Sequence, residues 1–169
     1  MQLVPISLDD EKNFNIYLKS IEKSFPQEER TDTLTYAKFL EHGGQPYYIV
    51  SKGQVVGVCY TFENASMAYI YYLAINENLR NNGLGSCAIK TLKEHFFDKP
   101  LALSIEEIDN NNIDTLRRYK FYTKNGFEKR NLSYTWQGVR LELMTDSAID
   151  IEEYKSTFGK LFYYTCYKN

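Results

Sequence analysis

Hydrophobic and polar positions along the chain follow two periods, one typical of helices and one typical of strands. Apolar residues recur at helical spacing in five segments: 9–21, 34–40, 83–97, 114–124 and 151–162. Runs of alternating or continuous apolar character, typical of strands, occupy residues 2–7, 47–62, 67–75, 101–108 and 132–144. Turn signals at Lys52-Gly53 and Gln137-Gly138 split the second and the last of these runs into hairpins. The predicted order is therefore β-α-α-β-β-β-α-β-α-β-β, followed by a helix.

The domain organisation is expected to be simple. A chain of 169 residues is long enough for one compact core, and no internal repeat or linker interrupts it. We expect a single domain over residues 1–169, with a core at 1–145 and a helical tail at 149–169. The apolar face of the tail predicts a helix docked on the core, with a homodimer contact as the alternative.

Charge and cysteine content narrow the classes of partner and location. The net charge of -2 argues against a nucleic-acid binder and is compatible with a cationic small molecule. Three widely spaced cysteines predict free thiols in a cytoplasmic protein. The sequence has no signal-peptide pattern and no run of roughly 20 apolar residues, so no membrane partner is expected. His42 and His95 lack metal-ligand spacing with cysteine, so no metal is expected.

A glycine-rich stretch at residues 79–90 satisfies a dinucleotide fingerprint. Gly83 to Ala88 reads G-x-G-x-x-A, and Glu106 lies 21 residues after Gly85 at the end of a predicted strand. In dinucleotide-binding folds, however, the first glycine follows its strand almost directly. Here the predominantly polar residues 76–82 separate Ile75 from the glycine, and hairpins flank the motif instead of βαβ units. An NAD-dependent oxidoreductase is therefore the less favoured interpretation.

The same stretch also reads as R-x-x-G-x-G, from Arg80 to Gly85. Backbone N–H groups of such a loop and of the helix that follows can surround a pyrophosphate, and the helix dipole adds to the attraction. Glycine lets the backbone approach without a Cβ in the way. The sequence therefore predicts a phosphate-bearing ligand held near Arg80.

Two motifs in register resemble the Gcn5-related N-acetyltransferase (GNAT) superfamily. "YYLAINENLRNNGLGSCAIKTLKEHF" is similar to its strand–loop–helix signature, and "RRYKFYTKNGF" is similar to its second signature, a tyrosine four residues before Gly-Phe. The resemblance covers residues 3–144. It implies an α/β (α+β) fold with a mixed, mostly antiparallel central sheet and helices on both faces, to which the C-terminal helix is an addition.

The resemblance also implies the coenzyme site. Acetyl-CoA would lie along the strand that ends at Leu73-Ala74-Ile75, where this strand and residues 101–108 splay apart. Tyr122 would sit by the sulfur and protonate the departing thiolate. The family often has asparagine seven residues before this tyrosine, where Thr115 stands here, so that contact is expected to be rearranged. The residues expected to bind the coenzyme are Leu73, Ala74, Ile75, Arg80, Asn81, Asn82, Gly83, Leu84, Gly85, Ser86 and Tyr122.

The general base and the acceptor pocket are less constrained. Glu106 would lie beside the splay, where the amine approaches, and is the candidate base and a candidate pocket residue. A Phe-Pro-x-x-Glu-Arg segment resembles one branch of the family and adds Glu29 and Arg30 to the acceptor pocket. Glu63 ends another strand and Glu107 points to the opposite face, and a water chain is an alternative to a dedicated base.

The resemblance implies an acetyl-CoA-dependent N-acetyltransferase acting on a primary amine by direct attack in a ternary complex. A non-catalytic acyl-CoA-binding or regulatory domain and an NAD-dependent oxidoreductase are the alternatives. A small-molecule amine is the favoured acceptor, with a peptide or protein amine left open.

Overall fold

The computed structural model describes residues 1–7, 9–25, 27–31, 38–136 and 138–166, which fall into two compact units. Unit 1 comprises Met1–Asn64 and Ile70–Phe97, and unit 2 comprises Ala65–Tyr69 and Asp98–Asn169. Strand β4 (Ala68–Ile75) begins in unit 2 and continues in unit 1. The expectation of a single domain stays a prediction.

Unit 1 is built on an antiparallel array of strands. Its further elements are β1 (Gln2–Pro5), α1 (Glu11–Ser24), η1 (Gln27–Glu29), β2 (Gly44–Ser51), β3 (Gln54–Glu63), η2 (Glu77–Leu79) and α3 (Leu84–His95). Residues 38–41 are helical, whereas the rest of the predicted second helix, including Leu34, lies outside the described residues. The predicted β2–β3 hairpin is confirmed, with Lys52 at φ 50° and Gly53 at φ 76°, as a tight twisted turn requires.

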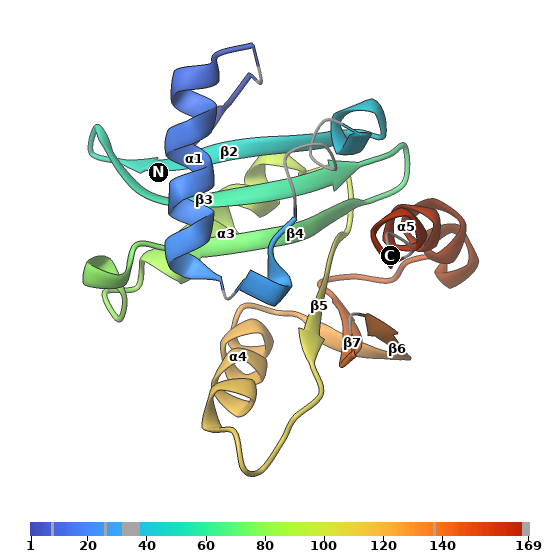
Figure 1. Ribbon diagram of the computed structural model, residues 1–169. Coiled ribbons are helices and arrows are strands. Elements are labelled where there is room, and N and C mark those ends of the chain that lie inside the picture. Colours follow the sequence, from blue (N-terminus) through green and yellow to red (C-terminus); the bar gives the residue numbers. More distant parts are fainter. Residues whose placement is uncertain (8, 26, 32–37, 137, 167–169) are drawn as a thin grey trace. The chain divides into compact units, whose positions relative to one another are not determined.

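Helices cover both faces of the unit 1 strands. In Figure 1, α1 crosses the near face of β2, β3 and β4, and α3 lies behind them. Asp10 caps α1 by accepting a hydrogen bond from the Asn13 backbone N–H at 3.1 Å. The buried stripe of α1 (Phe14, Tyr17 and Ile21) has the predicted helical spacing. Pro5 lies in the edge strand β1, which explains why it can lack a ladder N–H.

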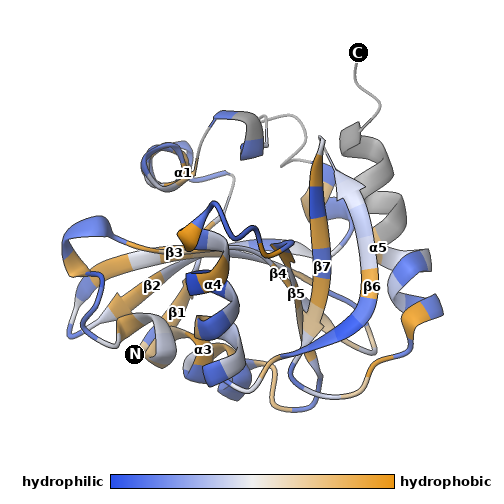
Figure 2. Ribbon diagram, turned by 90° about the horizontal axis from the view of Figure 1, so that it is seen from below, coloured by the Kyte–Doolittle hydropathy of each residue, from blue (hydrophilic) through white to orange (hydrophobic). Residues whose placement is uncertain are grey.

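Unit 2 contains the elements that carry the second predicted motif. These are β5 (Leu101–Glu106), α4 (Ile113–Lys124), β6 (Glu128–Trp136), β7 (Val139–Thr145) and α5 (Ile151–Cys166). The last hairpin places β7 next to β5, with Glu106 opposite Leu141, and β6 outside it. Alternating hydrophilic and hydrophobic segments along β7 are visible in Figure 2. The start of β4 joins this array, because the Ala68 N–H donates to the Pro100 carbonyl at 3.0 Å.

The resulting strand order is β1-β2-β3-β4-β5-β7-β6 in a seven-stranded, mostly antiparallel sheet, and the predicted mixed α/β class is confirmed.

The predicted helix of the tail is also confirmed. Tyr154 and Phe158 of α5 are buried against Tyr69, with ring centroids 6.0 and 5.2 Å away. Within the described part of the chain, no helix has the length and apolar character that would let it span a membrane.

Candidate functional site

The glycine loop has the form that its sequence predicts. β4 ends at Ile75, η2 occupies the link, and Gly83 precedes the first residue of α3 in the left-handed conformation, at φ 75°. Among the described residues, no side chain caps this helix end, and a Cβ built on Gly83 would meet no atom within 4 Å. The first N–H groups of α3 have no acceptor inside the helix.

Polar side chains hold the loop in shape. Asn81 also has a positive φ of 64°. The Asn82 side-chain amide donates to the carbonyls of Leu79 and Arg80 at 3.3 and 3.2 Å. Arg80 is exposed, and its Nε donates to the Ile75 carbonyl at 3.1 Å, which ties the guanidinium to the end of β4. A loop fixed in this way can accept an anion without much further ordering.

The other predicted coenzyme contacts lie on β4 and in the first turn of α3. Ala74 and Ile75 are buried, and Leu73, Leu84, Gly85 and Ser86 are partly buried. Cys87, in the first turn of α3, is a free thiol and is exposed. Its neighbour Ala88 is fully buried, and successive helical residues point about 100° apart, so the side chain of Cys87 leaves the buried stripe.

Tyr122 lies in the last turns of α4 and is partly buried. Its ring packs against those of Phe121 and Phe127, with centroids 5.0 and 5.8 Å away. Burial raises the pKa of Tyr122 to about 12, and the positive charge of Arg118 opposes this rise. The phenol therefore stays protonated at neutral pH, as a proton donor must.

Glu106 ends β5 and forms an ion pair with Arg118 of α4. The side chains are 25% and 42% exposed, so the pair is partly shielded from water. Arg118 was not singled out from the sequence. It belongs to the quoted motif and lies four residues before Tyr122, on the same face of a helix, and this spacing was the signal that could have identified it.

Thr115, at the position where the family that the motifs resemble often has asparagine, organises the loop between β5 and α4. Its side chain is buried, and its hydroxyl donates to the Asn112 carbonyl at 2.7 Å while accepting from the Asp109 N–H at 3.0 Å. The hydrogen bonds of this hydroxyl are therefore made within the loop. Asn112 caps α4 by accepting from the Asp114 N–H at 3.1 Å.

The segment expected to line the acceptor pocket is fixed to the elements around it. Glu29 lies in η1, where its carbonyl accepts a hydrogen bond from the Tyr72 hydroxyl at 2.5 Å. Arg30 donates from Nε to the Phe25 carbonyl and from a terminal nitrogen to the Glu22 carbonyl, both at 2.8 Å. The guanidinium thus satisfies carbonyls at the end of α1. The role of Glu29 and Arg30 toward an acceptor stays a prediction.

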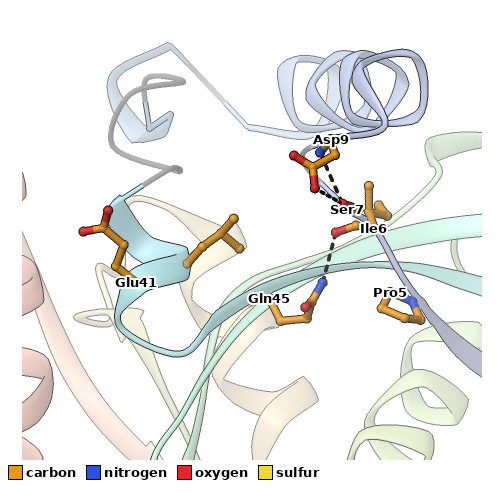
Figure 3. Close-up of a pocket in the computed structure, with 7 residues that line it drawn as sticks. Pro5, Ile6, Ser7, Asp9, Glu41 and Gln45 are labelled. Atoms are coloured by element: carbon orange, nitrogen blue, oxygen red, sulfur yellow. Dashed lines mark hydrogen bonds between the residues drawn. The ribbon is translucent and has the colours of Figure 1, made fainter.

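A pocket of about 560 Å³ opens at the end of the unit 1 strands that is opposite to the glycine loop (Figure 3). Gln45 lies at its base and donates to the Ile6 carbonyl at 3.1 Å. The Asn76 N–H donates to the Val56 carbonyl, so the glycine loop follows the end of β4 that lies near the β2–β3 turn. None of the predicted site residues lines the pocket, whose lining residues are Pro5, Ile6, Ser7, Asp9, Leu40, Glu41 and Gln45.

Across the described ranges, histidine, cysteine and carboxylate side chains form no group of three that could hold a metal ion.

The sequence matches a known family over most of its length. The family model described as "Acetyltransferase (GNAT) family" matches residues 11–127. The Bacillus subtilis (strain 168) protein YjbC, which bears an acetyltransferase name, is 33% identical over 63 residues, 37% of this chain and 32% of YjbC. The chain thus matches about a third of the length of that relative.

Solved structures share the fold. A GNAT-family chain from Bacteroides thetaiotaomicron that bears an acetyltransferase name aligns over 100% of both chains, with a TM-score of 0.83 and 21% identity. An aminoglycoside 6'-N-acetyltransferase complexed with coenzyme A aligns over 89% of this chain and 98% of its own, with a TM-score of 0.63 and 13% identity. A GNAT-family acetyltransferase from Elizabethkingia anophelis with acetyl-CoA bound covers 87% and 97%, with a TM-score of 0.55 and 16% identity.

Identities this low show the fold alone, whereas the family model spans both signature motifs and most of the elements described above. The chain belongs to the GNAT acetyltransferase family, a family of acyltransferases.

Proposed function

We propose that this protein is an acetyl-CoA-dependent N-acetyltransferase that transfers an acetyl group to a primary amine by direct attack in a ternary complex. The observation that carries the proposal is the loop from Arg80 to Gly85, which opens α3 with a left-handed Gly83, without a side-chain cap among the described residues and with no described atom within 4 Å of a Cβ at Gly83. An anion at a helix N-terminus gains both hydrogen bonds and a favourable dipole.

Coenzyme binding is assigned to the loop and to the strand before it. The pyrophosphate would accept hydrogen bonds from the N–H groups of residues 83–86, and Arg80 would contribute its charge. Leu73, Ala74 and Ile75 would contact the pantetheine arm through backbone groups, with Asn81 and Asn82 shaping the loop. The thioester supplies an activated acetyl group, and the protein orients it.

Tyr122 is proposed as the acid that protonates the leaving thiolate. Its raised pKa keeps the phenol protonated over the whole neutral range, so the proton is available in every turnover. Glu106 is proposed to help the amine lose its proton, from its place at the end of β5 in an ion pair with Arg118. A water chain to solvent remains the alternative base.

The acceptor is proposed to be a small-molecule amine, with Glu29, Arg30 and Glu106 in contact with it, and peptide or protein amines as the alternatives. One structural relative is an aminoglycoside 6'-N-acetyltransferase, which acts on a small molecule. We further propose a cytoplasmic protein that needs no metal, and a homodimer contact remains a proposal for the C-terminal tail.

Two measurements test the proposal. The midpoint of thermal unfolding should rise with acetyl-CoA and with CoA and should not change with NAD, because only a ligand that binds the folded state stabilises it. A panel of small amines, peptides and lysine-containing proteins is then screened for thiol release from acetyl-CoA. Stabilisation by acetyl-CoA without thiol release for any acceptor would favour the non-catalytic acyl-CoA-binding domain. Stabilisation by NAD alone would refute the coenzyme assignment.

A further inference from the structure

We infer that Arg118 is a positioning residue of the proposed acetyl transfer: it holds the Glu106 carboxylate and presents a fixed positive charge to Tyr122. This inference rests on the proposed function. It concerns three side chains of unit 2, which come from β5 and α4.

Arg118 is paired with Glu106 and lies about one helical turn before Tyr122. Residues four apart on a helix lie on one face, with Cβ atoms roughly 6 Å apart, so Arg118 and Tyr122 are neighbours along α4. The other end of the Arg118 side chain reaches the carboxylate of Glu106, which ends β5 twelve residues earlier. One side chain therefore connects the proposed base with the proposed acid.

The Arg118 side chain is 42% exposed, but the part of its guanidinium nearest the helix is shielded from water. Its Nε is buried and has no hydrogen-bond partner within the described part of the chain. A charge shielded from water acts more strongly on its neighbours than a solvated one, because the local dielectric constant is lower. Consistent with this, the Arg118 guanidinium lowers the pKa of Tyr122 against the rise that burial causes.

The neighbouring arginine shows what an ordinary surface pair looks like on the same helix. Arg117 pairs with Asp114 at 3.3 Å within α4, and these side chains are 72% and 56% exposed. That pair links residues of a single helix turn and contributes little to stability when it is solvated. The Glu106–Arg118 pair instead joins a helix to the end of a strand.

In the proposed reaction, the positive charge of Arg118 would act on the phenolate that Tyr122 becomes. When the amine nitrogen bonds to the acetyl carbon and the C–S bond breaks, the sulfur takes the electron pair and the proton of the Tyr122 hydroxyl. Tyr122 is then a phenolate until it regains a proton, which the amine nitrogen has lost, through water. A fixed guanidinium stabilises this phenolate and so strengthens Tyr122 as an acid.

The test compares Arg118→Met and Arg118→Lys with Arg117→Met as the matched control, each measured alone and with Tyr122→Phe. We expect Arg118→Met to lower kcat roughly tenfold, which is about 1.4 kcal/mol in the activation free energy, with little change in the KM for acetyl-CoA. Arg118→Lys keeps the charge and should retain most of kcat. In the Tyr122→Phe background Arg118→Met should lower kcat by a smaller factor, because only its effect through Glu106 remains, whereas a purely structural role would lower kcat by the same factor in both backgrounds.

A readout independent of turnover is the ionisation of the phenol itself. With 3-fluorotyrosine at position 122, the fluorine NMR titration midpoint should move to higher pH in Arg118→Met and stay unchanged in Arg117→Met. An unmoved midpoint, or equal losses of kcat for Arg118→Met and Arg117→Met, would overturn the inference. If the wild-type protein acetylates no amine, the proposed function fails instead, so the two failures are distinguishable.

Discussion

Replacing Gly83 with alanine adds one methyl group at the residue that opens α3. The backbone there has φ 75°, a conformation that costs an L-residue roughly 1–2 kcal/mol. No described atom lies within 4 Å of the added Cβ, so the free energy of unfolding should fall by this backbone strain and by nothing more. For a chain of this length, the midpoint of thermal unfolding should drop by roughly 2–8 °C.

The effect on the coenzyme should be larger than the effect on stability. The methyl group would project into the space that the phosphate is proposed to occupy. Loss of one charge-assisted hydrogen bond costs roughly 1.5–3 kcal/mol. The Kd for acetyl-CoA should therefore rise about ten- to 150-fold.

Gly53→Ala is the matched control for Gly83→Ala. Gly53 has φ 76° in the β2–β3 turn and also has no described atom near its added Cβ. The two variants should lose similar stability, but only Gly83→Ala should bind acetyl-CoA more weakly by calorimetry. A wild-type Kd for Gly83→Ala would refute the loop assignment, and equal weakening in both variants would show a global effect instead.

Three further predictions concern unit 2 and the buried phenols. Tyr122→Phe should lower kcat roughly 10²–10⁴-fold with an unchanged Kd for acetyl-CoA, and an unchanged kcat would refute the acid role. Burial raises the pKa of Tyr47 and of Tyr122 to about 12 in the folded protein, against 10 for an exposed phenol. The unfolded state loses these protons first, so denaturant titrations should show the corresponding stability in full below pH 10 and its progressive loss between pH 10 and 12. Thr115→Val leaves the Asp109 N–H without its acceptor and should lower the unfolding free energy by roughly 1–3 kcal/mol in urea titrations; an unchanged value would show that the loop does not depend on this hydroxyl.

Much of the fold could be predicted because it is encoded locally. The turn at Lys52-Gly53 requires two positive φ angles, and few residue pairs other than those with glycine adopt them, so the hairpin is readable from four or five residues. The stripe Phe14, Tyr17 and Ile21 identifies both α1 and its buried face. The glycine loop was predictable for the same reason.

Features that depend on distant partners were not predictable. Nothing in the alternation of residues 132–144 distinguishes β7 from β6 as the neighbour of β5, because both strands have a similar pattern. The ion pair of Glu106 joins side chains of different elements, so the sequence indicated the carboxylate without its partner Arg118. Arg30 was predicted to line the acceptor pocket, and that role stays a prediction, whereas its hydrogen bonds to the carbonyls of Glu22 and Phe25 emerge only in three dimensions.

The position of β7 between β5 and β6 also sets an order of events during synthesis. The paired residues are separated by 35 positions for Glu106 and Leu141 and by 43 for Ala102 and Thr145. Contacts over such separations form slowly, because a long loop must close first. One edge of β5, a strand of mostly buried residues, therefore stays open on the ribosome until β7 has been made. A nascent chain that pauses before Val139 exposes this edge to other chains, so the rate of translation through the last hairpin affects how much of the protein escapes aggregation.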